Sequence, residues 1–139
     1  MHKRRAILED IRGQLKAAAG LNGCWIQRGQ RNAKYPHCTI FAESESVDTL
    51  TIHAPARPQD RQLTVAVVGW VRGLPDDERA EGDMDTVAEI IETVVSIPID
   101  AEDSLLIGSD FEVSEDEPEI HLVKLTYQVS YMTNENDPT

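Results

Sequence analysis

The sequence predicts an α+β fold, in which a mixed, mostly antiparallel β-sheet carries two main helices packed on one face. The first observation is a long final strand at 119–132, in which apolar and polar side chains alternate. The second is a strongly apolar strand at 61–72. The third is a pair of amphipathic helical patterns at 3–19 and 84–96. All 139 residues are expected to form one domain.

The first helix is predicted over 3–19 because Ile7, Ile11 and Leu15 recur every four residues and form one apolar stripe. Gly20 suits the position that follows a helix, since glycine tolerates left-handed backbone. We expect the stripe to pack on the sheet, and binding of this helix to a membrane surface is the alternative. The rest of the helix surface is basic and carries Lys3, Arg4, Arg5, Arg12 and Lys16.

The segment between this helix and the strand at 61–72 is weakly patterned. The expected elements are short strands at 24–26, 36–42 and 49–53, a basic loop at 28–34 and an acidic, serine-rich turn at 43–48. In the second of these strands Cys38, Ile40 and Ala42 face one way.

The strand at 61–72 is apolar on both faces near its end. Leu63, Val65, Val67 and Val71 lie on one face, and Ala66, Val68 and Trp70 lie on the other. Either the fold covers both faces, or one face meets another subunit. Trp70 is therefore a candidate subunit-contact residue.

The C-terminal half completes the pattern. In the helix at 84–96 the apolar stripe consists of Met84, Val87, Ala88, Ile91, Val94 and Val95. Asp83 or Asp85 is the expected N-cap, and Pro98 ends the helix. A shorter strand at 105–113, an acidic turn at 114–119, the final strand and a polar C-terminal tail at 133–139 follow.

The charge of the chain is unevenly divided. Its net charge is −12, yet residues 1–34 hold eight of the thirteen basic residues and only two acids. A molecule with two unlike surfaces can bind copies of itself head to tail, and such contacts close into a ring when the rotation permits. A solvated acidic surface that keeps the protein soluble is the simpler interpretation. The acidic total disfavours nucleic-acid binding by a broad basic face.

The densest polar feature is the acidic cluster at 76–85, which includes Asp76, Asp77 and Glu78. A solvated loop is the favoured interpretation, because the cluster lacks the glycine and closing glutamate of an EF-hand loop. A weak magnesium site there is the alternative. We expect no resident cofactor.

Catalytic signatures are missing from the sequence, and we expect a protein that is not an enzyme. It contains no nucleophile elbow, P-loop or dinucleotide-binding motif. Cys24, His37 and Cys38 lack the paired spacing of a zinc site, and both cysteines are expected to be reduced thiols. Carboxylate pairs of the glycosidase type stay open as candidates, since any acid-rich chain contains them.

No targeting or membrane segment is expected. Glu9, Asp10 and Arg12 interrupt any apolar run after the basic start, so the N-terminus does not read as a signal peptide. No apolar stretch approaches the roughly 20 residues of a membrane span. We expect a soluble protein, intracellular when made, without a membrane partner.

Several motifs together resemble the tail terminator proteins of long-tailed phages, of the minor tail protein U type. The motifs are the opening helix from Arg4 to Asp10, the strand from Leu63 to Val71, Leu74-Pro75 with the acidic run after it, Ile97-Pro98, and the closing run from Leu125 to Tyr131. The closing run Leu-Thr-Tyr-Gln-Val-Ser-Tyr is the most specific of them. Residues 20–58 have no matching motif.

The resemblance implies a structural role. Such proteins form a hexameric ring that caps the tail tube, stops its polymerisation and presents a joining surface to the head connector. The implied partners are further copies of the chain, the tail tube protein and a head connector or neck protein, while DNA passes through the lumen without specific binding. The implied location is the virion tail, after assembly in the host cytoplasm.

A ring would give the charge division a purpose. We expect Arg28, Arg31 and Lys34 of one subunit to face the acidic loop with Asp76, Asp77 and Glu78 of its neighbour. The alternatives are another small head–tail connector or neck protein, a non-viral protein-binding adaptor that uses a sheet edge or Trp70, and a hydrolase with an acidic site.

Overall fold

The computed structural model describes residues 2–26, 34–49, 57–73, 78–114, 117 and 119–134, with the backbone alone for 78–81. The elements in chain order are α1 (Lys3–Lys16), β1 (Cys24–Ile26), β2 (His37–Thr49), β3 (Pro58–Arg72), α2 (Glu78–Val94), β4 (Asp103–Val113) and β5 (Ile120–Asn134). Within these ranges the strands form one sheet in the order β1-β2-β3-β5-β4. Among the described strands only β1 and β2 pair in parallel, which confirms the predicted mixed, mostly antiparallel α+β fold.

The centre of the sheet is the long antiparallel pair of β3 and β5. It runs from Pro58 opposite Asn134 to Arg72 opposite Ile120. Along β5 every odd position from His121 to Thr133 is buried, so the predicted alternation of the final strand is confirmed. The core side chains of the pair include Leu63, Val65, Val67, Val123, Leu125, Val129 and Tyr131, each fully buried.

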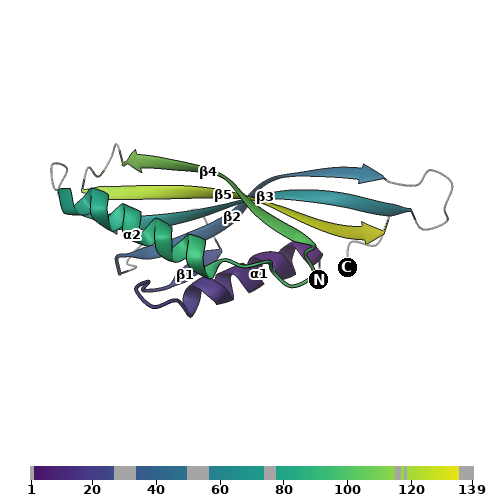
Figure 1. Ribbon diagram of the computed structural model, residues 1–139, viewed down its shortest axis with the longest axis horizontal. Helices are drawn as coiled ribbons and strands as arrows, with labels where there is room; N and C mark the ends of the chain where they lie inside the picture. The colour runs from purple at the N-terminus through teal and green to yellow at the C-terminus, as the bar shows by residue number, and fades with distance from the viewer. Residues whose placement is uncertain are drawn as a thin grey trace.

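Both helices cover the same face of this sheet (Figure 1). From α1, the predicted stripe of Ile7, Ile11 and Leu15 packs against β1 and β2. From α2, Val87 and Ile91 pack against β3 and β5. The periodicity of each helix therefore places its apolar residues on the sheet, as amphipathic helices require.

The loop after α2 is fastened to α1. The backbone N–H of Ile99 donates to Oδ2 of Asp10 at 2.8 Å, and that of Ser96 donates to Oε1 of Gln14 at 2.9 Å. These bonds satisfy backbone groups near the C-terminus of α2 and fix the path by which the chain reaches β4.

The sheet extends beyond its helices. In Figure 1 the outer ends of β2, β3 and β5 continue past the N-terminus of α1 without helix cover. We call this part the arm, and it comprises residues 46–49, 58–62 and 130–134. The arm shares its strands with the core, so its direction is fixed by the core.

Four predictions about these elements were wrong. Residues 43–48 form no turn, because β2 runs through them and pairs with β3 after a bulge between Ala42 and Ser44. The helices end at Lys16 and Val94, before the predicted residues 19 and 96. Since α2 begins at Glu78, Asp83 and Asp85 lie inside it and are not N-caps. Thr133 and Asn134 of the predicted tail belong to β5. The strand predicted at 49–53 is not tested, because its residues beyond Thr49 lie outside the described residues.

Gly69 lies where α2 packs directly on β3, and its replacement tests this packing. A Cβ at Gly69 would overlap Cγ1 of Val87 and approach Cγ1 of Val123 to 3.2 Å. We expect Gly69→Ala to lower the free energy of unfolding by roughly 1–3 kcal/mol, because Val87 is branched at Cβ and yields little. Urea denaturation measures this loss.

Gly13→Ala is the matched control. A Cβ there meets nothing within 4 Å, and the site lies inside α1. Alanine should stabilise that helix by roughly 0.5–1 kcal/mol. Equal stability of the two variants would contradict the close packing of α2 on β3.

Candidate assembly surfaces

The structure describes part of the interface that the sequence predicts. Arg28, Arg31, Asp76 and Asp77 lie outside the described residues, and Glu78 begins α2 with its side chain outside them. Lys34 is described and exposed, just before β2. The pairing of these basic and acidic residues between subunits therefore stays a prediction.

Trp70 lies on the sheet face away from the helices and contacts its own subunit. Its Nε1 donates to Oγ1 of Thr39 at 2.9 Å, and its ring stacks on buried His37 with centroids 6.2 Å apart. Tyr35 and Trp25 contact the same imidazole, and burial lowers the pKa of His37. Much of the indole is thus in contact with residues of its own subunit. The remainder borders an open cavity of about 520 Å³ next to β4.

A charged cluster fixes the start of α1 to the sheet. Glu45 accepts from Arg4 at 3.0 Å and from Arg61 at 3.3 Å, and the Tyr131 hydroxyl also donates to it. Arg61 donates further to Oγ1 of Thr133 at 2.9 Å. Because these residues come from α1, β2, β3 and β5, the cluster joins the helical layer to the base of the arm.

The sequence did not reveal the role of Glu45, which falls in the segment predicted as a turn. The available signal was the alternation of small polar Ser44 and Ser46 around Glu45 and Val47, a period of two that continues the strand.

Burial and charge shift the titration of this cluster. Burial, the hydrogen bond to Glu45 and the charge of Glu45 raise the pKa of Tyr131 to about 12, against the opposing effect of Arg61. Burial lowers the pKa of His2, and the charges of Arg4 and Arg61 lower it further. Neutral His2 accepts from the backbone N–H of Arg4 through Nδ1, so it serves as the N-cap of α1.

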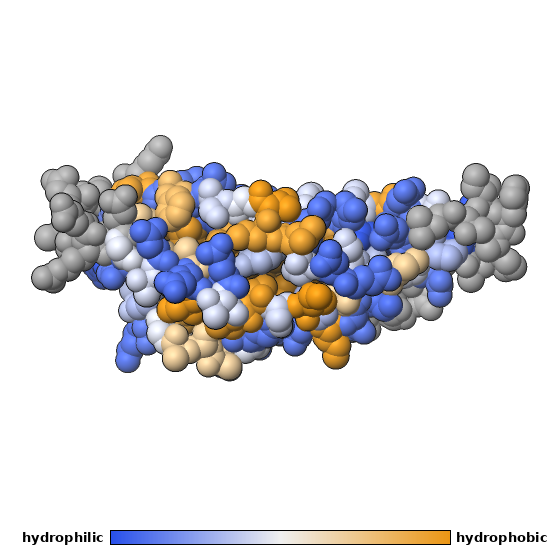
Figure 2. Space-filling view, in the orientation of Figure 1, coloured by the Kyte–Doolittle hydropathy of each residue, from blue (hydrophilic) through white to orange (hydrophobic). Residues whose placement is uncertain are grey.

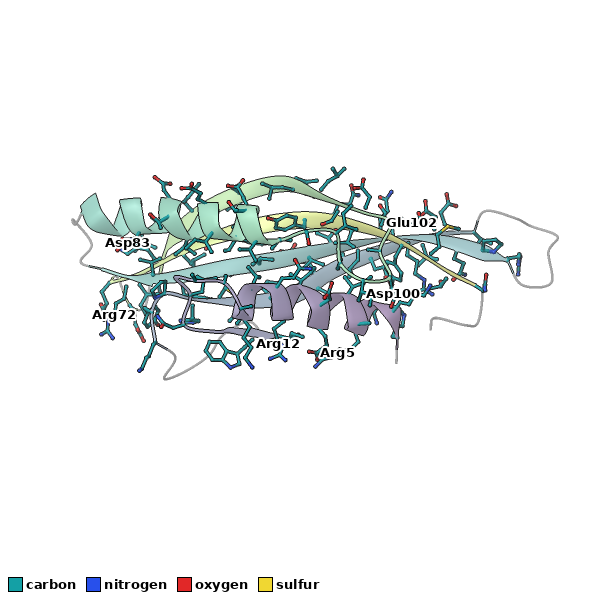
Figure 3. All side chains as sticks on the ribbon, turned by 60° about the horizontal axis from the view of Figure 1, so that its bottom comes forward. Arg5, Arg12, Arg72, Asp83, Asp100 and Glu102 are labelled. Carbon is teal, nitrogen blue, oxygen red and sulfur yellow. The ribbon has the colours of Figure 1, made fainter. Side chains whose placement is uncertain are left out.

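The outer face of α1 is a basic surface. Figure 3 shows Arg5 and Arg12 pointing from α1 away from the sheet. Both pair with Glu9, at 3.0 and 3.3 Å, and Lys16 is exposed beyond them. This face carries three cations and one carboxylate, so its net charge is positive.

The edge strand β4 is apolar and exposed. It pairs with β5 on one side, and no described strand pairs with its other side. Ile107 and Phe111 are 56% and 54% exposed, and a bulge between Leu106 and Gly108 turns Ile107 out of the regular ladder. The exposed apolar side chains of β4 and of the loop that leads into it are Ile97, Ile99, Leu105, Leu106, Ile107, Phe111 and Val113. Figure 2 shows apolar atoms gathered across the middle of this side of the molecule.

Exposed apolar side chains on an unpaired sheet edge are typical of a protein contact. The sequence predicted the strand without its exposure, because Leu105, Leu106 and Ile107 are consecutive and show no alternation.

Within the described ranges, no group of three or more His, Cys, Asp or Glu side chains could hold a metal ion. Of the acids in the suggested magnesium site at 76–85, Asp83 and Asp85 lie in α2, whereas the side chains of Asp76, Asp77, Glu78 and Glu81 lie outside the described part of the chain. Cys24 and Cys38 are neighbours in β1 and β2, free and buried, and their mutual hydrogen bond and burial raise the pKa of the Cys38 thiol. No helix in the described ranges combines the length and apolarity needed to cross a membrane.

No protein-family model and no curated protein matches this sequence. The structure is similar to a chain of a solved assembly titled "Virion of native gene transfer agent (GTA) particle". This chain shares its fold with that chain. The superposition has a TM-score of 0.59 and covers 94% of this chain and 97% of that chain, at 10% sequence identity. At that identity the likeness establishes a shared fold across the length of both chains.

The charged cluster at Glu45 predicts how stability depends on alkaline pH. The raised pKa of Tyr131 means that folding favours the neutral phenol, so this stabilisation is complete below pH 10 and is lost as the pH rises toward about 12. We expect Tyr131→Phe to cost about 1.5–3 kcal/mol at pH 7, because it removes a hydrogen bond to a carboxylate, and to flatten the alkaline loss. Urea denaturation from pH 7 to 11 measures both effects.

Tyr127→Phe is the matched control. Burial, followed by the charge of Glu92, raises the pKa of Tyr127 to about 12 as well, but its hydroxyl has no hydrogen-bond partner in the described structure. This variant should therefore flatten the alkaline loss without a cost at pH 7. A similar cost in both variants at pH 7 would exclude the Glu45 bond as the cause.

Proposed function

We propose that this chain is a structural phage tail terminator. In this role it forms a hexameric ring that caps the tail tube, stops tube polymerisation and provides the surface to which the head joins. The observation that carries the proposal is the fold shared with a virion chain over almost the whole length of both chains. The resemblance of the closing run from Leu125 to Tyr131 to tail terminators supports the same assignment.

The proposed partners follow from this role. They are further copies of the chain, the tail tube protein and a head connector or neck protein, with DNA passing through the lumen without specific binding. The proposed place of action is the virion tail, after assembly in the host cytoplasm. The role requires neither catalysis nor a resident cofactor.

The shape and charge of the subunit support a ring. A ring subunit needs two unlike lateral surfaces, because each contact in a cyclic hexamer is heterologous. The basic face of α1 and the apolar edge β4 are two such surfaces, since α1 covers β1 and β2 while β4 is the opposite edge of the sheet. The arm extends away from both, which leaves it free for a contact with a different partner (Figure 1).

Native mass spectrometry at low and moderate salt tests the ring directly. We expect a species close to 93 kDa, six times the 15.5 kDa chain, which weakens as salt rises because charge pairing contributes to assembly. Assembly only after addition of the tube protein also agrees with the proposal. A monomer that binds the connector protein but not the tube would instead indicate a neck protein.

The predicted basic loop gives a second test. We expect Arg28→Glu with Arg31→Glu to lower the proportion of six-chain species at least tenfold and to make the remainder less dependent on salt, because attraction to the acidic loop becomes repulsion. Titration of protein concentration in native mass spectrometry measures this loss.

The control carries the same change of charge elsewhere. Arg72→Glu with Lys124→Glu alters two cations that pair with Glu119 and Glu43 within the subunit. Both positions lie on the sheet face away from the helices. Equal loss of assembly in the two double variants would attribute the effect to net charge and contradict the predicted loop pairing.

A further inference from the structure

The exposed edge strand β4 lies in a strongly acidic part of the chain. The chain between Ala80 and Val123 contains fourteen acidic residues and neither lysine nor arginine. Five of these acids are exposed in β4 or in the loop that leads into it, and we call them the border: Asp100, Glu102, Asp103, Asp110 and Glu112. Figure 3 shows Asp100 and Glu102 where the loop after α2 leads into β4. The surface is therefore an apolar strip with an acidic border.

This border restricts what can cover the strip. Nucleic acid and anionic lipid are repelled by it. Symmetric pairing of β4 with β4 of a second copy would place Asp103, Asp110 and Glu112 near the same acids of the partner, and such like-charge contact is unfavourable. A molecule that covers the strip must therefore present apolar groups together with positive charge.

The chain itself presents such a surface at the other edge of its sheet. The outer face of α1 offers Arg5, Arg12 and Lys16, with Glu9 as the opposing charge between the two arginines. Next to it lie apolar groups that are not fully buried, namely Ala17, Ala19 and Ile26. Both the charge and the apolar content of this side complement the border and the strip.

We propose that β4 of one copy docks against the α1 side of a second copy. Ile107 and Phe111 are covered by the end of α1 and by β1, and the acidic border faces Arg5 and Arg12. The contact is heterologous, because α1 and β4 occupy opposite edges of the sheet, so it propagates from copy to copy. This inference rests on the proposed ring and assigns its junction to β4, in addition to the acidic segment at 76–85 that the sequence suggested.

Two complementary variants test the junction. The first, Ile107→Asp with Phe111→Asp, damages only the β4 surface, and the second, Arg5→Glu with Arg12→Glu, damages only the α1 surface. All four side chains are exposed or form surface ion pairs, so both variants should fold, as circular dichroism would verify. Alone, each should lose the six-chain species in native mass spectrometry. Mixed in equal amounts, they should form a two-chain complex and nothing larger, because one intact β4 meets one intact α1.

Val47→Asp is the matched control, since Val47 is 49% exposed and lies on the arm. It should retain the six-chain species. Six chains in every variant would overturn the β4 junction while the ring stands, and a mixture without the two-chain complex would overturn the pairing of β4 with α1.

If the unaltered protein gives only monomers, cross-linking decides. Ile107 is replaced by p-benzoylphenylalanine, and a mixture of ¹⁴N- and ¹⁵N-labelled protein is irradiated at millimolar concentration. Cross-links from position 107 to residues 3–26 of another copy support the junction. Cross-links to β4 of another copy, or none between copies, overturn it. The ring itself is tested separately, by the six-chain mass with and without the tube protein.

Discussion

The antiparallel pairing of β3 with β5 is the interaction on which the rest of this structure depends. It joins fifteen residue pairs, and β2 and β4 pair with its two outer sides. Because side chains alternate along a strand, a slip of one residue would move the buried face of β5 to solvent. The alternation from His121 to Thr133 therefore fixes the register, and the register fixes the surface on which both helices pack.

The length of this pair also determines which surfaces stay uncovered. The helices occupy only part of the sheet, with α2 held close by the absence of a side chain at Gly69 and α1 held by the cluster at Glu45. Beyond them the same strands continue as the arm, and outside α2 the strand β4 is left with exposed apolar side chains. One long strand pair thus gives the subunit a rigid core. The projecting arm and the open edge at β4 extend from this core in different directions.

Sequence reasoning predicted the parts of the fold that depend on periodicity. The final strand, the strand at 61–72 and the apolar stripes of both helices follow directly from repeats of two and of three to four residues. It failed at 43–48, where serine and acidic residues have turn-like local preferences but pairing with β3 and the partners of Glu45 favour a strand. It also misplaced the start of α2, because the acidic residues taken as loop and N-cap are equally suited to the first turns of a helix.

The candidate assembly surfaces were predictable only in part. The division of charge was visible in the sequence, and the basic face of α1 follows from it. The exposure of β4 was not, since an apolar run does not show which of its sides the fold covers. Trp70, expected at a subunit contact, has much of its ring occupied by His37 and Thr39 of its own subunit, a pairing set by strand register that local sequence does not encode.

The tail terminator proposed here would end a growing tail tube. The most direct measurement is the length distribution of tubes in electron micrographs. The cognate tube protein is polymerised in the presence of increasing concentrations of this chain. We expect shorter tubes that carry a ring at one end and stop growing when more tube protein is added. Tubes of unchanged length without an end ring would contradict it.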